Sequence, residues 1–390
     1  MKIKEGVYWV GVKDPKLRIF DVIMQAEYGT TYNSYLVVGN EKIALIDTVK
    51  ESFKDEFFKK IEEIVPIEKI DYVIINHTEP DHSGALSYLL EKTNAKVIAS
   101  KNASMFLKEI LHKDVNPMLV GDNDKISLGN KTLEFISAPF LHWPDTMITY
   151  LPEYKILFPC DFLGCHYCDE KIFNDETLDF SFAFEHYFMT IMRPFKDYAL
   201  QAIKKLESKE IDIIAPSHGP ILRKDPWYYI NKYKEWSMPR PKNGKSAVIF
   251  YASPYGSTGK LGQAIAEGLS SEGIVTEIFD LVGTSVNSVI DIIENSDAII
   301  VGSATINGDA IKPVWDLLSS LSTINLKNKI GFAFGTYAWS GEGAKLIENR
   351  LKDLKLKVPE QYFRAQMIPT EEDFAKAREI GKKLAAIIKT

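Results

Sequence analysis

Cysteine is scarce in this sequence. Three cysteines occur in 390 residues, and all of them, Cys160, Cys165 and Cys168, lie within nine residues of one another. A small odd number of cysteines in a long chain excludes a disulfide framework. The Cys165-x-x-Cys168 pair has no second pair with which to build a four-cysteine iron or zinc site, so we interpret the cysteines as structural.

Long hydrophobic runs are also missing. The chain has no run of eighteen apolar residues and no apolar stretch at its amino terminus, which predicts neither a membrane-spanning helix nor a signal peptide and favours a cytoplasmic protein. A net charge of −6 without a basic patch argues against a nucleic-acid partner. The apolar content of 45% suits a globular protein, and the length predicts two or three domains.

Eight residues, His77-Thr-Glu-Pro-Asp-His-Ser-Gly84, carry the most chemical information. They follow the apolar run 71–76, a predicted buried strand, and should form the loop at its carboxyl end. In an extended segment the alternate residues His77, Glu79 and Asp81 would converge on one spot, and His82 is a fourth ligand type. The alternative is a polar loop that caps a helix starting near His82 or Ser83. Four ligand types at this spacing favour a metal site, but the string alone does not name the metal.

The string resembles the metallo-β-lactamase fold signature, with one difference. Hydrolases of that superfamily have His-x-His-x-Asp-His, whereas Glu79 stands here in place of the second histidine. A carboxylate is a harder, anionic ligand, which favours iron or manganese over zinc. The variant is similar to that of the flavodiiron proteins, also called A-type flavoproteins.

The order of elements in residues 1–243 predicts a metallo-β-lactamase-like αββα sandwich, with two sheets in the middle and helices outside. Short apolar runs predict an antiparallel meander first, and helices then interleave with strands before strands return from Lys131. The predicted strands are 18–24, 32–38, 42–47, 71–76, 96–100, 132–139, 155–160 and 211–216, and the predicted helices are 51–65, 83–92 and 103–112.

Three further residues at predicted strand ends extend the ligand set: His142, Asp161 and His218. The resemblance implies that one iron is bound by His77, Glu79 and His142. It implies that the other is bound by Asp81 and His218, with Asp161 bridging the two. His82 is also included as a metal residue, although in the family its equivalent does not always reach the metal. Of the other histidines, His112, His166 and His186 are assigned to the surface or to a second layer around the metals, and Tyr187 is not counted as catalytic.

Residues 239–244 are rich in proline, glycine and charge and predict a linker. Beyond it, residues 244–390 alternate between apolar strands and helical segments, which predicts an α/β flavodoxin-like doubly wound parallel sheet. The predicted strands are 246–251, 275–279, 298–302, 330–334 and 362–367, and the predicted helices are 258–270, 289–295, 312–321, 343–354 and 372–388.

The loop Ser253–Thr258 resembles the flavodoxin phosphate loop, in which hydroxyls, backbone amides and a helix amino terminus face a phosphate. Two later loops follow the third and fourth strands at the carboxyl edge, and Trp339 and Tyr337 could stack on a flavin. No Gly-x-Gly-x-x-Gly occurs, so FMN is favoured over a dinucleotide. The predicted FMN-binding residues are Ser253, Tyr255, Gly256, Ser257, Thr258, Ser303, Ala304, Thr305, Asn307, Gly308, Thr336, Tyr337, Trp339 and Gly341.

The resemblance covers the whole chain and implies an enzyme that reduces dioxygen to water or nitric oxide to nitrous oxide at a diiron centre supplied through FMN. It also implies a head-to-tail homodimer, or a dimer of such dimers. Because the chain ends directly after the flavodoxin-like unit, we expect an external electron donor, either rubredoxin or a reduced deazaflavin coenzyme. The alternatives are a dinuclear zinc hydrolase of the thioesterase or lactamase type with an appended flavodoxin, and an electron carrier. The sequence does not separate dioxygen from nitric oxide as the substrate.

Overall fold

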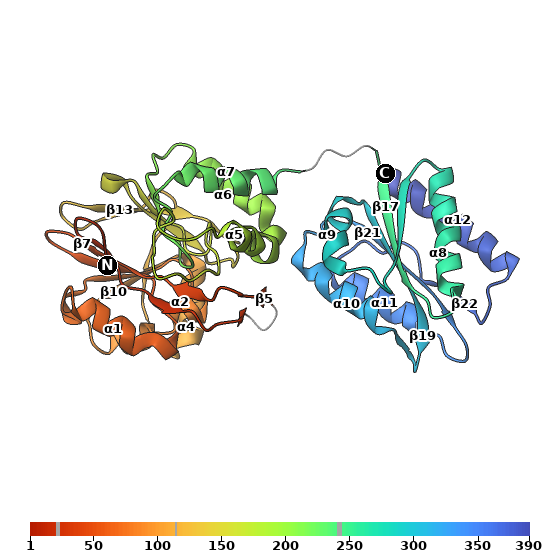
Figure 1. The fold of residues 1–390 in the computed structure, drawn as a ribbon, viewed down its shortest axis with the longest axis horizontal. Helices are drawn as coiled ribbons and strands as arrows, with labels where there is room; N and C mark the ends of the chain where they lie inside the picture. Colours follow the sequence, from red (N-terminus) through yellow and green to blue (C-terminus); the bar gives the residue numbers. More distant parts are fainter. Residues whose placement is uncertain (21–23, 114, 240–243) are drawn as a thin grey trace. The chain divides into compact units, whose positions relative to one another are not determined.

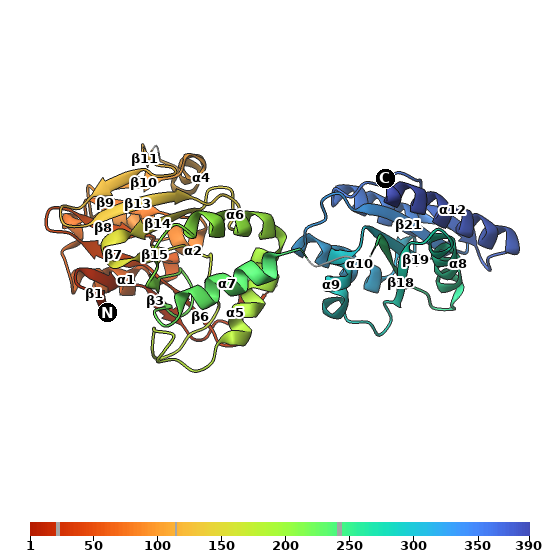
Figure 2. The ribbon, with the colours of Figure 1, turned by 90° about the horizontal axis from the view of Figure 1, so that it is seen from above.

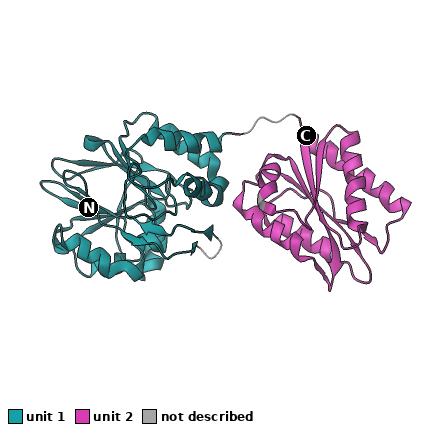
Figure 3. Cartoon of the chain, in the orientation of Figure 1, with its two compact units in different colours: residues 1–238 teal, residues 239–390 magenta. Residues whose placement is uncertain are grey.

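The computed structural model describes residues 1–20, 24–113, 115–239 and 244–390. The chain divides into two units, Met1–Met238 and Pro239–Thr390 (Figure 3). The predicted boundary after residue 243 falls at the end of segment 240–243, which lies outside the described residues, so the boundary itself stays a prediction.

Two β-sheets form the centre of the first unit. Alternate residues of a strand point to opposite faces, and Tyr35 and Val37 therefore meet Phe135 and Phe158 of the other sheet, whereas Leu36 faces outward to helices. The seven-stranded sheet has the order β1 (Lys2–Lys4), β2 (Val7–Trp9), β7 (Tyr35–Val38), β8 (Ile43–Ile46), β9 (Tyr72–Ile75), β10 (Lys96–Ala99) and β11 (Met118–Leu119). The five-stranded sheet has the order β12 (Lys125–Ser127), β13 (Thr132–Ser137), β14 (Met147–Leu151), β15 (Ile156–Phe158) and β16 (Ile213–Ile214).

Helices cover the outer faces of both sheets, which confirms the αββα prediction (Figure 1). On the seven-stranded side, α1 (Lys54–Glu62) buries Phe57 and Ile61, which are four residues apart and so share one helix face. The other helices there are α3 (Leu86–Leu90) and α4 (Lys101–Leu111), and those on the five-stranded side are α5 (Ser181–Tyr187), α6 (Lys196–Leu206) and α7 (Pro226–Ser237).

The second unit has one central sheet with helices on both faces (Figures 1 and 2). Its strand order is β18 (Val275–Asp280), β17 (Ser246–Ala252), β19 (Ala298–Ile306), β21 (Ile330–Tyr337) and β22 (Phe363–Gln366), and neighbours in this order are parallel. The order places the second strand outside the first, as in flavodoxin, and confirms the doubly wound prediction. One face carries α8 (Ser257–Ser271) and α12 (Glu371–Lys389), and the other carries α9 (Val286–Asn295), α10 (Lys312–Ser320) and α11 (Glu342–Asp353).

Two predicted elements of the first unit are split. The expected helix 83–92 is two short helices, α2 (Pro80–Ser83) and α3. Between them, a side chain at Gly84 would lie 2.4 Å from the Pro80 carbonyl oxygen, so the tight packing requires glycine. The expected strand 32–38 is broken at Asn33, because the Asn33 backbone amide donates to the Ser217 carbonyl instead of to a neighbouring strand. The Asn33 side-chain amide also donates to the carbonyls of Pro216 and Gly219.

Other differences lie before and after the central sheets. The run 18–24 is not one strand: β4 (Ile19–Phe20) pairs antiparallel with β5 (Met24–Gln25), and residues 21–23 lie outside the described residues. The hairpin of β3 (Val12–Asp14) and β6 (Thr30–Tyr32) was not predicted. Helices α5 to α7 were missed as well, although Ala199, Ala202, Ile203 and Leu206 of α6 show a helical spacing.

In the part of the chain that the structure describes, no helix is both long and apolar enough to cross a membrane.

Candidate metal centre

The seven predicted metal residues gather at one rim of the first unit, because they lie in the connections that follow β9, β13, β15 and β16. His77 comes after β9, His142 lies between β13 and β14, Asp161 follows β15 and His218 follows β16. Glu79 is the residue before α2, whereas Asp81 and His82 lie inside that helix. The expected convergence of His77, Glu79 and Asp81 along an extended segment is therefore wrong, since the helical turn at Pro80 directs Asp81 to a different group.

The first group contains His77, Glu79, His142 and one oxygen of Asp161. The Glu79 Oε2 atom lies 3.2 Å from His77 Nε2 and 3.2 Å from His142 Nε2. The Asp161 Oδ2 atom lies 3.6 Å and 3.5 Å from the same two nitrogens. Two imidazoles and two carboxylate oxygens thus face one another.

The second group contains Asp81, His82 and His218, together with the other oxygen of Asp161. The Asp161 Oδ1 atom lies 3.1 Å from His82 Nε2 and 3.3 Å from His218 Nε2. The Asp81 Oδ2 atom lies 3.2 Å from His218 Nε2. The carboxylate of Asp161 therefore presents one oxygen to each group, as a bridging ligand would.

Both groups fit a first-row transition metal. Ligand atoms that each lie about 2.1 Å from one metal are roughly 3.0 to 3.4 Å apart along a polyhedron edge, close to the spacings in both groups. Both oxygens of Asp81, the Oδ2 atom of Asp161 and the Nδ1 atom of His82 are buried and form no hydrogen bond with any described residue. Buried polar atoms of this kind are costly unless something binds them. A mixture of nitrogen and carboxylate oxygen suits iron.

The orientation of two histidines is fixed from behind. The Asp145 carboxylate lies 3.2 Å from His77 Nδ1 and also accepts hydrogen bonds from the backbone and hydroxyl of Thr78. His218 Nδ1 donates to the Thr31 carbonyl at 2.6 Å. In both rings the Nε2 atom is left to face the centre, which is how ligating histidines are normally held.

Asn76, directly before His77, ties the two sheets together beneath the site. Its backbone amide donates to Asp47 at 2.8 Å, and its side chain accepts a bond from Thr149 at 2.7 Å. Burial raises the pKa of Asp47 to about 6, and the bonds from Asn76 oppose this rise. These bonds fix the backbone directly before His77, so the position of the His77 ring is well defined.

The carboxylates make the centre attractive to positive charge. Burial alone would lower the pKa of His77, but its bonds with Asp145 and Glu79 outweigh burial and raise this pKa to about 10. The pKa values of His82 and His142 are likewise raised to about 10, against burial, mainly by Asp161. A metal cation replaces such protons with its own charge, so metal binding should release protons.

Four further residues lie close to the centre, of which the sequence analysis missed Thr30 and Asp145, whereas it placed His166 at the surface or in a second layer and did not count Tyr187 as catalytic. The Tyr187 hydroxyl donates to Asp161 Oδ1 at 3.1 Å, and Thr30 Oγ1 lies 2.9 Å from His166 Nδ1. His166 is buried with its ring against His218, so it lies in the second layer, whereas His112 is exposed as expected. Asp145 follows His142 by three residues, but nothing in one sequence marks it as the partner of His77.

The cysteines are free thiols. Cys160 lies under the centre, near His82 and Asp161, and accepts a hydrogen bond from Ser217. Burial raises the pKa of the Cys160 thiol well above its ordinary value, so the thiol stays protonated. Cys165 packs so closely on Gly219 that a side chain there would lie 2.6 Å from its sulfur.

The predicted FMN residues of the second unit lie at the carboxyl edge of its sheet. Gly256, with a φ of 80°, precedes α8, and the Ser253 hydroxyl accepts from the Thr258 amide at 3.1 Å. Thr258 and Thr336 share a buried hydroxyl contact of 2.8 Å, which links the first loop to the end of β21. Hydroxyls at a helix amino terminus suit a phosphate group.

The two later loops differ from the prediction in detail. Residues 303–305 belong to β19, and Thr336 and Tyr337 belong to β21, so only the following residues are loop. Asn307 and Gly308 form the two-residue turn from β19 to β20 (Asp309–Ala310), and both have the positive φ that such a turn needs. Gly341 precedes α11.

Tyr255 and Trp339 are exposed by 95% and 82%, respectively. Large aromatic side chains of a folded unit are rarely left so open, and a flat ring system would cover them. Tyr337 is half-buried under the guanidinium of Arg364, 5.0 Å from its ring centre, so it is less free to stack than the sequence suggested.

Both units match known families. The ODP family beta lactamase model matches residues 30–219, and the flavodoxin model matches residues 249–381. The flavo-diiron protein FprA2 of Clostridium acetobutylicum is 41% identical over 398 residues, covering 100% of this chain and 99% of that protein. The nitric oxide reductase of Moorella thermoacetica is 38% identical over 392 residues, covering 99% and 98%.

Among solved structures, the rubredoxin oxygen:oxidoreductase of Desulfovibrio gigas aligns with a TM-score of 0.73 and 31% identity, over 100% of this chain and 98% of that one. The similarity thus spans both units in the same order. The chain belongs to the flavodiiron proteins, oxidoreductases whose cofactors are a diiron centre and FMN.

Proposed function

We propose that this protein reduces dioxygen to water, nitric oxide to nitrous oxide, or both, at a diiron centre that receives electrons through FMN. The observation that carries the proposal is Asp161, whose two oxygens face two separate groups of ligand atoms. The names of two relatives, a nitric oxide reductase and a rubredoxin oxygen:oxidoreductase, support the choice of substrates.

In this proposal the first iron is held by His77, Glu79 and His142, and the second by Asp81, His82 and His218, with Asp161 between them. Glu79 is the residue that favours iron, because a hydrolytic zinc site would have a histidine there. When bound, the iron pair supplies one electron from each ion to a diatomic molecule. The side chains of the protein hold and orient this iron pair.

The chain positions the centre and controls its protons. Asp145 and the Thr31 carbonyl hold His77 and His218 in the orientation that points Nε2 inward. Tyr187 donates a hydrogen bond to Asp161, which limits rotation of that carboxylate. The Glu79 and His142 side chains are the most exposed of the seven, by 12% and 15% against 9% for Asp81, so small molecules would reach the centre from that side.

The second unit supplies the electrons in this proposal. Ser253, Ser257 and Thr258 would hold the FMN phosphate, and Trp339 would cover the flavin ring. Four electrons and four protons convert one dioxygen to two waters, and two of each convert two nitric oxide molecules to nitrous oxide and water. An external reductant, rubredoxin or a reduced deazaflavin coenzyme, must provide them.

We propose a head-to-tail homodimer in which the FMN of one chain serves the irons of the other, or a dimer of such dimers. The test is to mix two inactive chains, Glu79→Ala, which lacks the diiron centre, and a chain with Ser257→Glu, which repels the FMN phosphate. A mixed dimer with transfer between chains keeps one working pair of cofactors and regains activity. Transfer within each chain would leave the mixture inactive.

The function itself is tested by counting iron, zinc and FMN per chain and then mixing the reduced protein anaerobically with each gas. We expect two irons, one FMN and rapid flavin reoxidation, and the faster gas identifies the preferred substrate. Rubredoxin and the reduced deazaflavin coenzyme are compared as reductants in the same assay. Two zincs, with flavin oxidised as slowly as free FMN, would instead indicate a hydrolase.

A further inference from the structure

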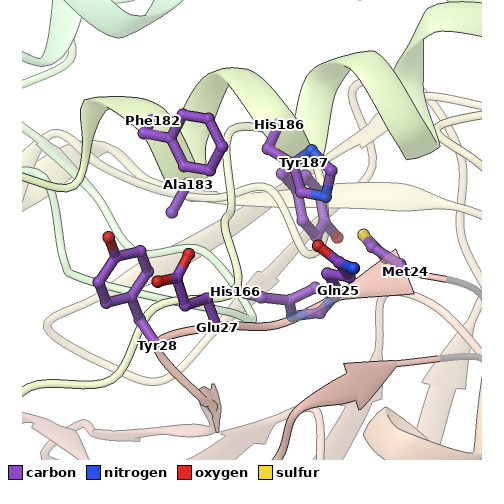
Figure 4. A pocket seen from close by; sticks show the side chains of 9 residues that line it. All are labelled: Met24, Gln25, Glu27, Tyr28, His166, Phe182, Ala183, His186 and Tyr187. Carbon is purple, nitrogen blue, oxygen red and sulfur yellow. The ribbon is translucent and has the colours of Figure 1, made fainter. Parts of the chain in front are cut away.

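A cavity of about 70 Å³ lies in the first unit beside the metal centre (Figure 4). One side is formed by residues of α5, including Ala183, His186 and Tyr187. The opposite side is formed by residues 24–28, and His166 completes the wall. The rim is open to solvent, because Tyr28 is 47% exposed and Phe182 of α5 is 67% exposed.

Two residues of this wall also contact the candidate ligands. The Tyr187 hydroxyl donates to Asp161, and the His166 ring packs on His218 with 4.8 Å between ring centres. The cavity is therefore separated from the metal centre by a single layer of side chains.

Two histidine nitrogens of the wall are buried and lack partners. The Nε2 atoms of His166 and His186 form no hydrogen bond with any described residue. In His186 the ring bonds the Gln25 backbone, so its Nε2 atom remains for another partner. Water supplies such partners, and a cavity needs only roughly 15 Å³ to hold one molecule. This cavity is large enough for a short chain of waters between His186 and His166.

We propose that this cavity is the route by which protons from solvent reach the metal centre, with His186 as the group that collects them. The proposal rests on the proposed function, because reduction of either gas consumes protons. Because His186 Nε2 is buried, it takes a proton from water that enters at the open rim of the cavity and releases it to the next water inside, beside Tyr187 and His166. The imidazole ends unchanged, no electron moves, and solvent is the net proton source.

The surroundings suit this role. The titratable groups that line the cavity with His186 are Glu27, Tyr28 and His166 from other segments and Tyr187, its neighbour on α5. Burial lowers the pKa of His186, and its bond to the Gln25 backbone opposes this. The ring is therefore mostly neutral near pH 7, with Nε2 free to accept a proton, and the exposed Glu27 carboxylate at the rim attracts cations.

The first test compares His186→Asn with the control His112→Asn in the holoenzyme. His112 is exposed and ends α4, far along the chain from the cavity wall. We expect turnover of the gas that wild type reduces to fall on the order of a hundredfold in His186→Asn, to fall further as the pH rises, and to be restored by added imidazole. His112→Asn should match wild type. Unchanged turnover in His186→Asn, or a loss that imidazole does not restore, would overturn the proposal.

A second test does not depend on turnover. A high-resolution crystal structure of the holoprotein should show ordered water linking His186 Nε2 to His166 Nε2, and Ala183→Met should displace this water. Turnover by Ala183→Met should also fall, and added imidazole should not restore it. A dry cavity would overturn the proposal. If wild type consumed neither gas, the proposed function would fail, whereas the water chain would still decide whether the route exists.

Discussion

Asp145→Asn is expected to weaken metal binding in the group of His77 while the fold is kept. Both hydrogen bonds from Thr78 end on Oδ2 of Asp145, so the single carbonyl oxygen of asparagine can retain them. The amide NH₂ then replaces Oδ1, which lies 3.2 Å from His77 Nδ1. A donor would then face the Nδ1–H donor of His77, and the remaining oxygen, 3.3 Å from Nδ1, already accepts both bonds from Thr78. The contact that directs the Nε2 atom of His77 inward is therefore weakened.

Loss of such a supporting partner typically costs about 10- to 100-fold in metal affinity, which is about 1.4 to 2.7 kcal/mol. Among the described residues, the histidines of the second group form no hydrogen bond with Asp145, and His218 donates to the Thr31 carbonyl instead. When Co²⁺ is titrated into the metal-free protein, we therefore expect weaker affinity for the ion in the group of His77 and unchanged affinity for the ion in the second group.

The matched control is Asp197→Asn, an exposed carboxylate in the first turn of α6. Thermal unfolding of the metal-free variants is measured alongside, to separate a local effect from a general loss of stability. If Asp145→Asn bound both ions within about threefold of wild type, Asp145 would not be the residue that supports His77. Equal weakening of both steps would likewise contradict the reasoning.

Glu79→His should lower the iron-to-zinc ratio of the purified protein, measured by elemental analysis, because a softer nitrogen replaces a hard oxygen; an unchanged ratio would show that Glu79 does not select the metal. Trp339→Ala should raise the FMN dissociation constant by roughly two- to tenfold in a fluorescence titration, because one aromatic stacking contact is lost. The melting temperature should not fall, since the Trp339 side chain is exposed. Burial opposes ionisation of Glu134, but its ion pairs with Lys125 and Lys209 outweigh burial and lower its pKa below the ordinary 4.5. These ion pairs therefore stabilise the fold fully above pH 4.5. Their contribution is lost as the pH falls through the lowered pKa of the folded protein. Glu134→Gln should therefore lower the melting temperature at pH 7, and its difference from wild type should shrink as the pH falls through the lowered pKa; a difference that stays constant as the medium is acidified would contradict the assignment.

The architecture was predictable from sequence because the patterns are local and repeated. Strand and helix alternation after residue 244 has a single common solution, the parallel doubly wound sheet, and the structure has that order. The seven candidate metal residues could be selected from the sequence because ligand types at strand ends are unusual in combination, and the structure brings them together in two groups. Their division into two groups came from the family resemblance, whereas the spacing argument placed Asp81 wrongly.

The remaining features depend on contacts that one sequence does not reveal. The pairing of Asp145 with His77 joins residues from two different connections, and Thr31 reaches His218 from a hairpin that was not predicted. The break after Ser83 depends on how closely the backbone of Glu51 approaches Gly84. A Cβ atom at position 84 would lie only 2.7 Å from the Glu51 backbone nitrogen. Such tertiary contacts override local helix propensity.

The candidate ligands are spread along the first unit, from His77 to His218, and this has a consequence during protein synthesis. The ribosome releases the chain from its amino end, so the His77–His82 segment emerges long before His218 completes the second group. Until then the segment offers at most His77, Glu79, Asp81 and His82, without Asp161 between the two groups or Asp145 behind His77, and zinc binds such histidine and carboxylate sets readily. If these residues hold the irons, we expect that correct metal choice would require the first unit to fold before the early histidines capture an ion, and the metal supplied during translation would then affect which ion the protein holds.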